Sequence, residues 1–204
     1  MSSLRIAGVI PARLSSTRLS RKVLRIIAGR PMVEWVWRAA MASGLMDPVV
    51  VATDSGEVAL VLRERGIPVA MTPVDCPSGS DRVRKVARQI DADIYVNIQG
   101  DEPTLTPEFF PPLLALFDRD GAGFGGYRKH LGIYAYRKAA LERFAALEPS
   151  PLERMERLEQ LRLLENGIGL YVAEAPGDAI GVDTEADLVR AEAVLRERDG
   201  GQAA

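Results

Sequence analysis

"RIAGVIPARLSSTRLSRK", residues 5–22, joins a short apolar run to a loop rich in cationic and hydroxyl side chains. The apolar run ends at Pro11 and is typical of a buried β-strand. Arginine, serine, threonine and lysine residues follow it at once, which suits a loop that binds phosphate groups. No glycine-rich run ending in GK[ST] is present, so the loop is not a Walker A motif. The stretch predicts a strand followed by a phosphate-binding loop, with an ordinary solvated basic loop as the alternative.

Apolar runs and amphipathic segments alternate after this loop. Further strands are predicted at 48–53, 67–71 and 93–99, and helices at 29–44, 55–66 and 78–90. Short strands that alternate with longer helices are typical of a parallel sheet covered by helices. The sequence thus predicts an α/β fold of three layers, with a mostly parallel sheet and helices on both of its faces.

The second half of the chain is less regular and predicts a small appendage to this sheet. Helices are expected at 106–117, 138–147, 149–167 and 184–198, and strands at 130–136 and 168–175. Thr184 has the residue type of an N-cap for the last helix. Because no repeat or low-complexity linker interrupts the chain, residues 1–204 are expected to form one domain.

Composition excludes several classes of protein. The net charge of −2 provides no general attraction to nucleic acid or to an anionic membrane. No apolar run reaches the roughly 18 residues of a membrane span. The single cysteine, Cys76, cannot form an intramolecular disulfide and fits a reducing compartment. We therefore expect a cytoplasmic protein whose basic site, if it has one, is local.

Four polar clusters follow predicted strands, and the carboxyl ends of parallel strands form the ligand crevice of such sheets. The first cluster is the opening loop, where Arg13, Ser16, Arg18 and Lys22 offer donors and positive charge suited to a triphosphate.

The second cluster is "YVNIQGDEP", residues 95–103. Strand alternation places Asn97, Gln99 and Asp101 on one side. Gly100 lets a ligand approach the backbone, and Asp101 with Glu102 offers oxygen ligands for Mg²⁺. The alternative is a capped surface turn.

The other two clusters precede predicted helices. Asp183, in "GVDTEADL", is either a ligand or a helix cap. "PSGSDR" sets Ser78, Gly79 and Ser80 at a helix N-terminus, where free amides favour anions, and Arg82 adds charge; an ordinary N-cap is the alternative.

Two further features carry less chemistry by themselves. His130 is the only histidine and is either a structural residue beside a strand or part of a site. Glu153, Glu156 and Glu159 lie three residues apart on one side of a predicted helix, followed by Gln160. Like charges at this spacing are unfavourable unless a partner offsets them.

Seven stretches, taken in order, resemble the 3-deoxy-manno-octulosonate cytidylyltransferase family, also called CMP-Kdo synthetase. They are residues 10–22, 51–54, 77–82, 96–103, 130–137, 149–162 and 181–188. The resemblance implies a Rossmann-like nucleotidyltransferase fold and transfer of CMP from CTP to the anomeric hydroxyl of the acidic sugar Kdo. Pyrophosphate is released, and the product serves lipopolysaccharide biosynthesis.

The resemblance also implies roles for individual residues. Binding of CTP falls to Arg13, Ser16, Arg18, Lys22, Ser78, Gly79, Ser80 and Arg82, of which Arg18 and Lys22 act in catalysis as well. Asp101 and Asp183 are expected to be catalytic and to coordinate Mg²⁺. Gln99, His130, Glu159 and Gln160 are expected to face the sugar acid.

This chain departs from the family pattern in three places. Ser20 stands where the family usually has proline, and Ser80 where it has threonine. A block of roughly fifty residues, with dimerisation strands and a sugar-binding arginine, is absent near residues 117–118. The resemblance predicts a homodimer only if that block exists. Either the block is deleted, or a stretch is missing from the printed sequence. We favour the second explanation, which predicts a Cα separation between Phe117 and Asp118, or within a few residues of them, far above the usual 3.8 Å.

Other functions stay open at this point. The acceptor can be a different acidic sugar or a phosphonate, whose pocket does not need the absent block. A non-catalytic protein that binds CTP is a second alternative, although it would not need both Asp101 and Asp183. A metal-dependent glycosyltransferase fits less well, because "GDEP" is not a DxD motif.

Overall fold

The computed structural model describes residues 4–14, 19–76, 78–118 and 130–201. Its first half contains β1 (Ile6–Pro11), η1 (Lys22–Leu24), β2 (Ile26–Ile27), β3 (Arg30–Pro31), α1 (Met32–Ala42), β4 (Val49–Thr53), α2 (Gly56–Glu64), β5 (Val69–Met71), α3 (Gly79–Ala87) and β6 (Ile94–Ile98). Its second half contains η2 (Pro107–Phe109), α4 (Phe110–Leu114), η3 (Ala115–Asp118), β7 (Ile133–Arg137), α5 (Lys138–Ala146), α6 (Pro151–Glu156), α7 (Leu161–Glu165) and α8 (Glu185–Gly201).

The main sheet has the strand order β5-β4-β1-β6-β7. The first four strands pair in parallel, and β7 pairs antiparallel with β6, from Ile94 opposite Arg137 to Ile98 opposite Ile133. The predicted α/β fold with a mostly parallel sheet is confirmed. The predicted strands of the first half, and the one at 130–136, all form.

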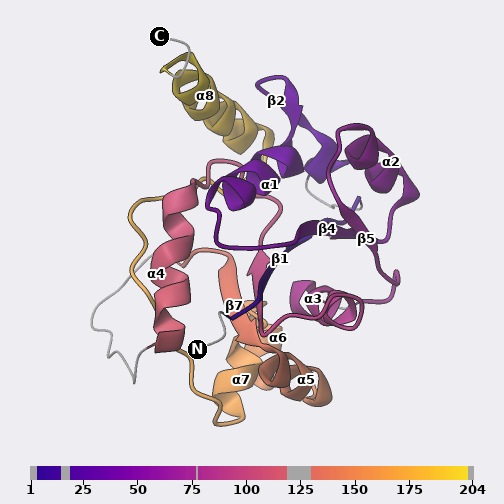
Figure 1. Cartoon of the computed structure of the whole chain (residues 1–204), viewed down its shortest axis with the longest axis vertical. Helices are drawn as coiled ribbons and strands as arrows, with labels where there is room; N and C mark the ends of the chain where they lie inside the picture. Colours follow the sequence, from indigo (N-terminus) through magenta and orange to yellow (C-terminus); the bar gives the residue numbers. More distant parts are fainter. Residues whose placement is uncertain (1–3, 15–18, 77, 119–129, 202–204) are drawn as a thin grey trace.

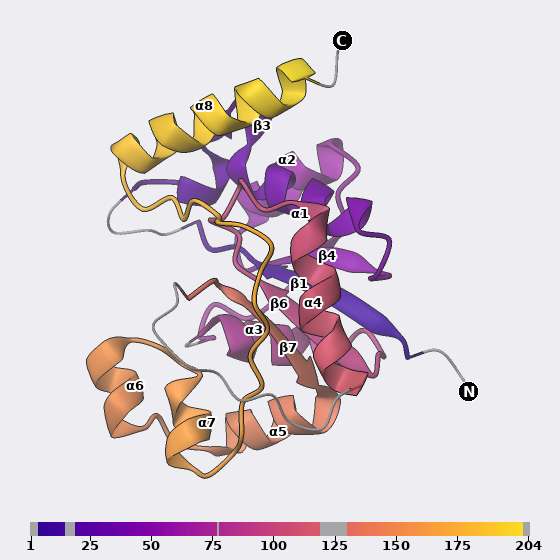
Figure 2. The ribbon, with the colours of Figure 1, turned by 90° about the vertical axis from the view of Figure 1, so that its left-hand side faces the viewer.

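Two apolar clusters sandwich this sheet because its side chains alternate between faces. On one face, Ile10 and Val96 pack with side chains of α1, α2 and α4. On the other face, Val9 and Tyr95 pack with α3, α5 and Leu163 of α7. The molecule therefore has the three expected layers, seen in Figures 1 and 2 with the sheet between the two sets of helices.

A third cluster attaches α8 to the hairpin of β2 and β3, at the opposite end of the molecule from α6 (Figure 2). Trp35 of α1 lies in this cluster, donates a hydrogen bond to the Ile27 carbonyl at 2.8 Å and has the Arg198 guanidinium 5.7 Å from its ring centroid. Trp37, two residues later, packs on the first cluster instead and donates to the Val49 carbonyl at 3.1 Å. The two indoles thus face different clusters.

Two predicted elements of the second half are wrong. The single helix expected at 149–167 is two short helices, α6 and α7, because Arg157 adopts left-handed backbone angles of φ 57° and ψ 37°. Residues 168–175 form no strand, and Leu170, Tyr171 and Val172 remain exposed. Among the strands that the structure describes, β7 pairs only with β6, so none pairs with this apolar run.

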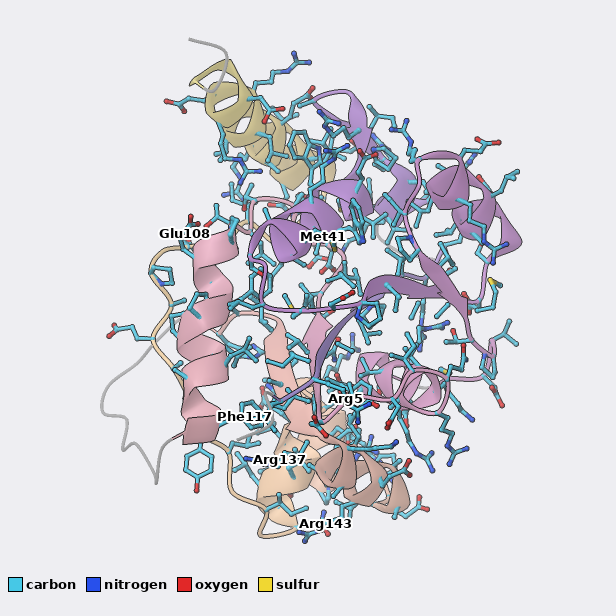
Figure 3. All side chains as sticks on the ribbon, in the orientation of Figure 1. Arg5, Met41, Glu108, Phe117, Arg137 and Arg143 are labelled. Atoms are coloured by element: carbon cyan, nitrogen blue, oxygen red, sulfur yellow. The ribbon has the colours of Figure 1, made fainter. Side chains whose placement is uncertain are left out.

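The chain continues through Phe117 and Asp118 in the 3₁₀ helix η3. The Phe117 ring lies 5.1 Å from the Arg137 guanidinium, which fixes the end of this helix beside β7 (Figure 3). The wide separation expected between Phe117 and Asp118 is therefore wrong. A separation within the next few residues would fall on 119–129, which lie outside the described residues.

Candidate active site

A cavity of about 650 Å³ lies at the carboxyl end of β6, where the sequence predicts the ligand crevice. Its lining comes from five separate parts of the chain. They are Ser78 and Gly79; Gln99, Asp101 and Glu102; His130, Gly132 and Tyr134; Pro149, Glu153, Arg154, Arg157, Leu158, Glu159 and Gln160; and Gly181 and Asp183.

Lys22 connects the two predicted metal ligands. Its ammonium donates to Asp101 Oδ2 at 2.7 Å and to Asp183 Oδ1 at 2.8 Å, although 161 residues separate Lys22 from Asp183. Only 10% of the lysine side chain is exposed. Burial by itself lowers the pKa of Lys22, but the Asp101 and Asp183 carboxylates outweigh it and raise the pKa above its ordinary value. The ammonium is thus held in its charged form.

The backbone fixes this convergence. Val182 N donates to the Asp101 carbonyl at 2.8 Å, which ties the segment before α8 to the end of β6. A Cβ at Gly100 would lie 3.0 Å from the Pro11 carbonyl oxygen, so a larger residue would push β6 away from β1. The predicted proximity of Asp101 and Asp183 is present in the structure.

The phosphate-binding loop is described in part. Arg13 is exposed and donates to the Cys76 carbonyl, which places it beside the loop that leads into α3. Ser16 and Arg18 lie outside the described residues. Lys22 closes the loop at the carboxylate pair. Arg13 and Lys22 therefore stand at the two ends of the predicted phosphate site.

The helix N-terminus in "PSGSDR" forms as expected, but its residues do different things. The Ser78 hydroxyl caps α3 by accepting from Asp81 N at 3.1 Å, and Ser78 and Gly79 line the cavity. Arg82 does not line the cavity. Its guanidinium is fully buried, donates to Thr72 and pairs with Asp54 at 3.2 Å. Arg82 therefore supports the fold beside the cavity and does not itself line it.

Ser80 is the centre of a buried polar network. Its hydroxyl donates to Glu159 Oε1 at 2.8 Å and lies 3.2 Å from the Tyr136 hydroxyl, while its backbone N donates to Glu159 Oε2. Asn97 Nδ2 donates to the same hydroxyl at 3.3 Å. The Glu159 carboxylate thus lies at the positive N-terminal end of α3, which holds the segment between α6 and α7 against the floor of the cavity.

His130 and Gln160 meet on one wall of the cavity. His130 Nε2 lies 2.8 Å from the Tyr134 hydroxyl and 3.4 Å from Gln160 Nε2. Although His130 keeps contact with solvent, desolvation by neighbouring atoms lowers its pKa, and burial raises the pKa of Tyr134. Both rings are therefore neutral near pH 7 and offer hydrogen bonds to a hydroxylated ligand.

Glycine is needed where the wall approaches the floor. A Cβ at Gly132 would collide with the Gln99 side chain, and Gly132 N donates to Glu102 Oε1 at 2.9 Å. This close contact keeps Gln99 at the lining of the cavity. All four residues predicted to face the sugar acid, Gln99, His130, Glu159 and Gln160, line it.

Tyr134, Arg154 and Arg157 also line the cavity, although no motif in the sequence marks them as site residues. Period-two alternation from His130 through Gly132 to Tyr134 was a usable signal for the tyrosine. Arg154 and Arg157 are three residues apart among the glutamates of 153–159, as expected for one helix face. The break in the helix at Arg157, which turns the chain toward α3, had no local signal.

Comparisons with known proteins agree on one family. A family model described as Cytidylyltransferase matches residues 7–114 and 112–174. A 3-deoxy-manno-octulosonate cytidylyltransferase of Acidobacterium capsulatum is 55% identical, covering 97% of this chain and 99% of the relative. The enzyme of the same name from Koribacter versatilis is 44% identical, covering 94% of this chain and 90% of the relative. The Acidobacterium alignment has 243 positions and this chain 204 residues, so the relative has residues without a counterpart here.

Solved structures give the same answer. The structure of CMP:2-keto-3-deoxy-manno-octonic acid synthetase complexed with CTP has a TM-score of 0.83 at 31% identity, covering 95% of this chain and 99% of that chain. A cytidylyltransferase from Leptospira borgpetersenii, at 16% identity, 97% and 96% coverage and a TM-score of 0.72, shares the fold. Sequence identity over nearly the whole chain, shared fold and the matching family model lead to one conclusion. The chain belongs to the 3-deoxy-manno-octulosonate cytidylyltransferase family.

Proposed function

We propose that this protein transfers CMP from CTP to the anomeric hydroxyl of Kdo and releases pyrophosphate, in the biosynthesis of lipopolysaccharide. The proposal is supported by the names of the relatives and by the CTP complex of the solved structure. The observation that carries it is the convergence of Asp101, Asp183 and Lys22 at the edge of the cavity. This convergence supports the proposal, because a reaction between nucleotide phosphates and an acceptor hydroxyl needs charged groups held together at one point.

The residues present fit a magnesium ion. The Lys22 ammonium occupies the position between the two carboxylates that we propose for the metal ion, since it contacts one oxygen of Asp101 and one of Asp183. Mg²⁺ is typically held by one or two carboxylates, with water and substrate phosphates completing the shell. Among the described residues no group of three or more His, Cys, Asp and Glu side chains forms a metal site. When bound, Mg²⁺ would lower the pKa of the acceptor hydroxyl and offset phosphate charge.

Cations of this chain would hold the triphosphate. Arg13 and Lys22 flank the loop, and Ser16 and Arg18, between them in sequence, are proposed as further donors. Attack of the acceptor oxygen on the α-phosphorus would form one P–O bond, and the hydroxyl proton would be lost to solvent. The bond from the α-phosphorus to the oxygen that bridges to the β-phosphorus would break, and pyrophosphate would leave with that oxygen and its charge. Catalysis of such a displacement depends on positioning and on charge neutralisation.

The remaining lining would select the two substrates. Ser78 and Gly79, at the free amides of α3, are proposed to contact the cytidine half of CTP. Gln99, His130 and Gln160 present amide and imidazole groups to the hydroxyls of the sugar. Glu159 is already engaged by Ser80, so we propose that it positions this wall in addition to facing the acceptor.

One assay tests the function: pyrophosphate release with CTP, Mg²⁺ and Kdo, with each omitted in turn. We expect release only with all three present, and a loss of at least about 100-fold in kcat for Asp101→Asn with little change in CTP affinity. Glu108→Gln, on the outer edge of the molecule (Figure 3), is the matched control that keeps full activity.

The outcomes separate the remaining alternatives. Turnover with a different acidic sugar or a phosphonate, but not with Kdo, would identify another acceptor. The residues that the Acidobacterium relative has and this chain lacks make that comparison necessary. CTP binding without pyrophosphate release from any acceptor would indicate a non-catalytic binding protein.

The setting of the enzyme is proposed on separate grounds. Among the described helices none is both long and apolar enough to cross a bilayer. The lone Cys76 fits a reducing compartment, and we propose the cytoplasm. The absence of the family block near residues 117–118 of the printed sequence is supported by the two-part match of the family model. Whether the block exists in the protein stays a prediction, and so does the homodimer that depends on it.

A further inference from the structure

Among the charged residues that line the cavity, the carboxylates have hydrogen-bond donors, whereas the arginines form no ion pairs with described residues. Five carboxylates line it, and the structure gives each a donor: Lys22 for Asp101 and Asp183, Gly132 N for Glu102, Arg162 for Glu153 and Ser80 for Glu159. The described cations of the lining are Arg154 and Arg157. Neither arginine forms an ion pair with a residue that the structure describes. Arg154 lies next to Glu153, a carboxyl whose pKa is lowered mainly by Arg162 and less by Arg154, whereas no carboxylate of the lining adjoins Arg157 in sequence.

The position of Arg157 is built by the fold. Its backbone N donates to the Glu153 carbonyl at 2.8 Å as α6 ends, and its left-handed angles turn the chain into the segment that Ser80 holds through Glu159. A residue other than glycine is disfavoured in this conformation. The surrounding contacts therefore impose the turn and keep a long cationic side chain at the edge of the cavity.

We propose that Arg157 binds the carboxylate of the sugar acid acceptor. This inference rests on the proposed function. A cation without a partner in the free enzyme suits an anionic group of the ligand, because a guanidinium and a carboxylate pair through two parallel hydrogen bonds. Of the two anionic groups brought by the substrates, the triphosphate has Arg13 and Lys22. The wall formed by α6, Gln160 and His130 holds Arg157 and is the side proposed for the sugar.

The test combines variants of the enzyme with variants of the acceptor. Arg157→Gln is expected to raise the KM for Kdo by roughly 10- to 100-fold, the loss of a charged hydrogen-bonded pair, and to leave the KM for CTP within about twofold. Arg157→Lys keeps the positive charge but not the planar guanidinium that forms two parallel hydrogen bonds. It should therefore recover part of the affinity for Kdo that Arg157→Gln loses. Arg143→Gln is the matched control, since Arg143 is an exposed residue of α5 (Figure 3) and does not line the cavity.

The acceptor arm separates recognition of charge from general damage. With the C1-amide of Kdo, which lacks the negative charge, the unsubstituted enzyme and Arg157→Gln should have the same KM. An equal penalty with Kdo and its amide, a shift confined to the KM for CTP, or a penalty seen with Arg154→Gln alone would each overturn the inference. Absence of turnover by the unsubstituted enzyme would instead overturn the proposed function beneath it.

Discussion

Lys22 Nζ lies 2.7 Å from Asp101 Oδ2, across 79 residues of sequence, and shares its charge with Asp183. In this state the lysine is the counterion of the carboxylates that are proposed to bind Mg²⁺. A divalent cation entering between them has to displace the ammonium, which is then available to the triphosphate. On this account the metal would compete with Lys22 for the two carboxylates, and the displaced lysine would assist binding of the nucleotide.

Lys22→Met is expected to move two affinities in opposite directions. Without nucleotide, Mg²⁺ should bind on the order of tenfold more tightly, because the competing charge is gone. CTP should bind on the order of tenfold more weakly, because a cation that pairs with phosphate is lost. Calorimetric titrations of each ligand measure both changes, and Lys138→Met, at an exposed lysine of α5, serves as the control. Weaker binding of Mg²⁺ alone would contradict the displacement.

His130 is expected to titrate below its ordinary pKa of about 6.5, because desolvation disfavours the imidazolium. Between its folded pKa and 6.5 the unfolded chain binds more protons, so stability should fall slightly as the pH drops through that window. NMR of the imidazole protons gives the midpoint directly, since the chain has one histidine. His130→Gln should remove this part of the pH dependence of unfolding. A midpoint above 6.5 would refute the assignment of a neutral ring.

Arg162→Met is expected to lower the free energy of unfolding by about 3–5 kcal/mol, because it strands a nearly buried carboxylate. Arg162 donates to Glu153 at 2.7 Å through Nε and stacks 4.3 Å from the Phe144 ring centroid. Urea unfolding measures the change. Adding Glu153→Gln should restore part of the stability by removing the unpaired charge. A single variant within 1 kcal/mol of the unsubstituted protein would show that the pair is dispensable.

Ala28→Asn is expected to raise the free energy of unfolding by about 1 kcal/mol. Ala28 and Gly29 form the turn of the β2–β3 hairpin with φ values of 45° and 82°. Asn-Gly is favoured where both central residues of a hairpin turn have positive φ. Thermal unfolding should show a higher midpoint for Ala28→Asn and a lower one for Gly29→Ala. Equal midpoints for all three proteins would mean that the turn is unstrained.

Local patterns were sufficient for the main sheet but not for the second half. The apolar runs at Ile6–Pro11, Val49–Thr53 and Ile94–Ile98 are buried on both faces and show no alternation, so their short length distinguishes them from helices. Residues 168–175 have the same local character, yet a strand also needs an edge to pair with, and that is a property of the whole fold. The hairpin of β2 and β3 is too short for any periodicity.

The site divides in the same way. Asp101 and Gln99 could be selected because they follow β6, and Ser78 because it begins α3. Asp183 precedes a helix, and its approach to Asp101 depends on a backbone contact between Val182 and Asp101 that no sequence pattern records. Arg82 has the charge of a ligand-binding residue, but its burial against Asp54 depends on packing that sequence alone does not reveal.

The opposite orientations of Trp35 and Trp37 give the enzyme two separate optical reporters. Trp35 touches the end that carries α8, and α8 begins two residues after Asp183. Trp37 touches the sheet, away from that helix. In a protein whose Trp37 is replaced by Phe, the remaining indole emission reports on the seating of α8. A rearrangement of Asp183 during metal loading that shifts α8 thereby becomes a fluorescence signal, readable in a stopped-flow instrument before any product forms.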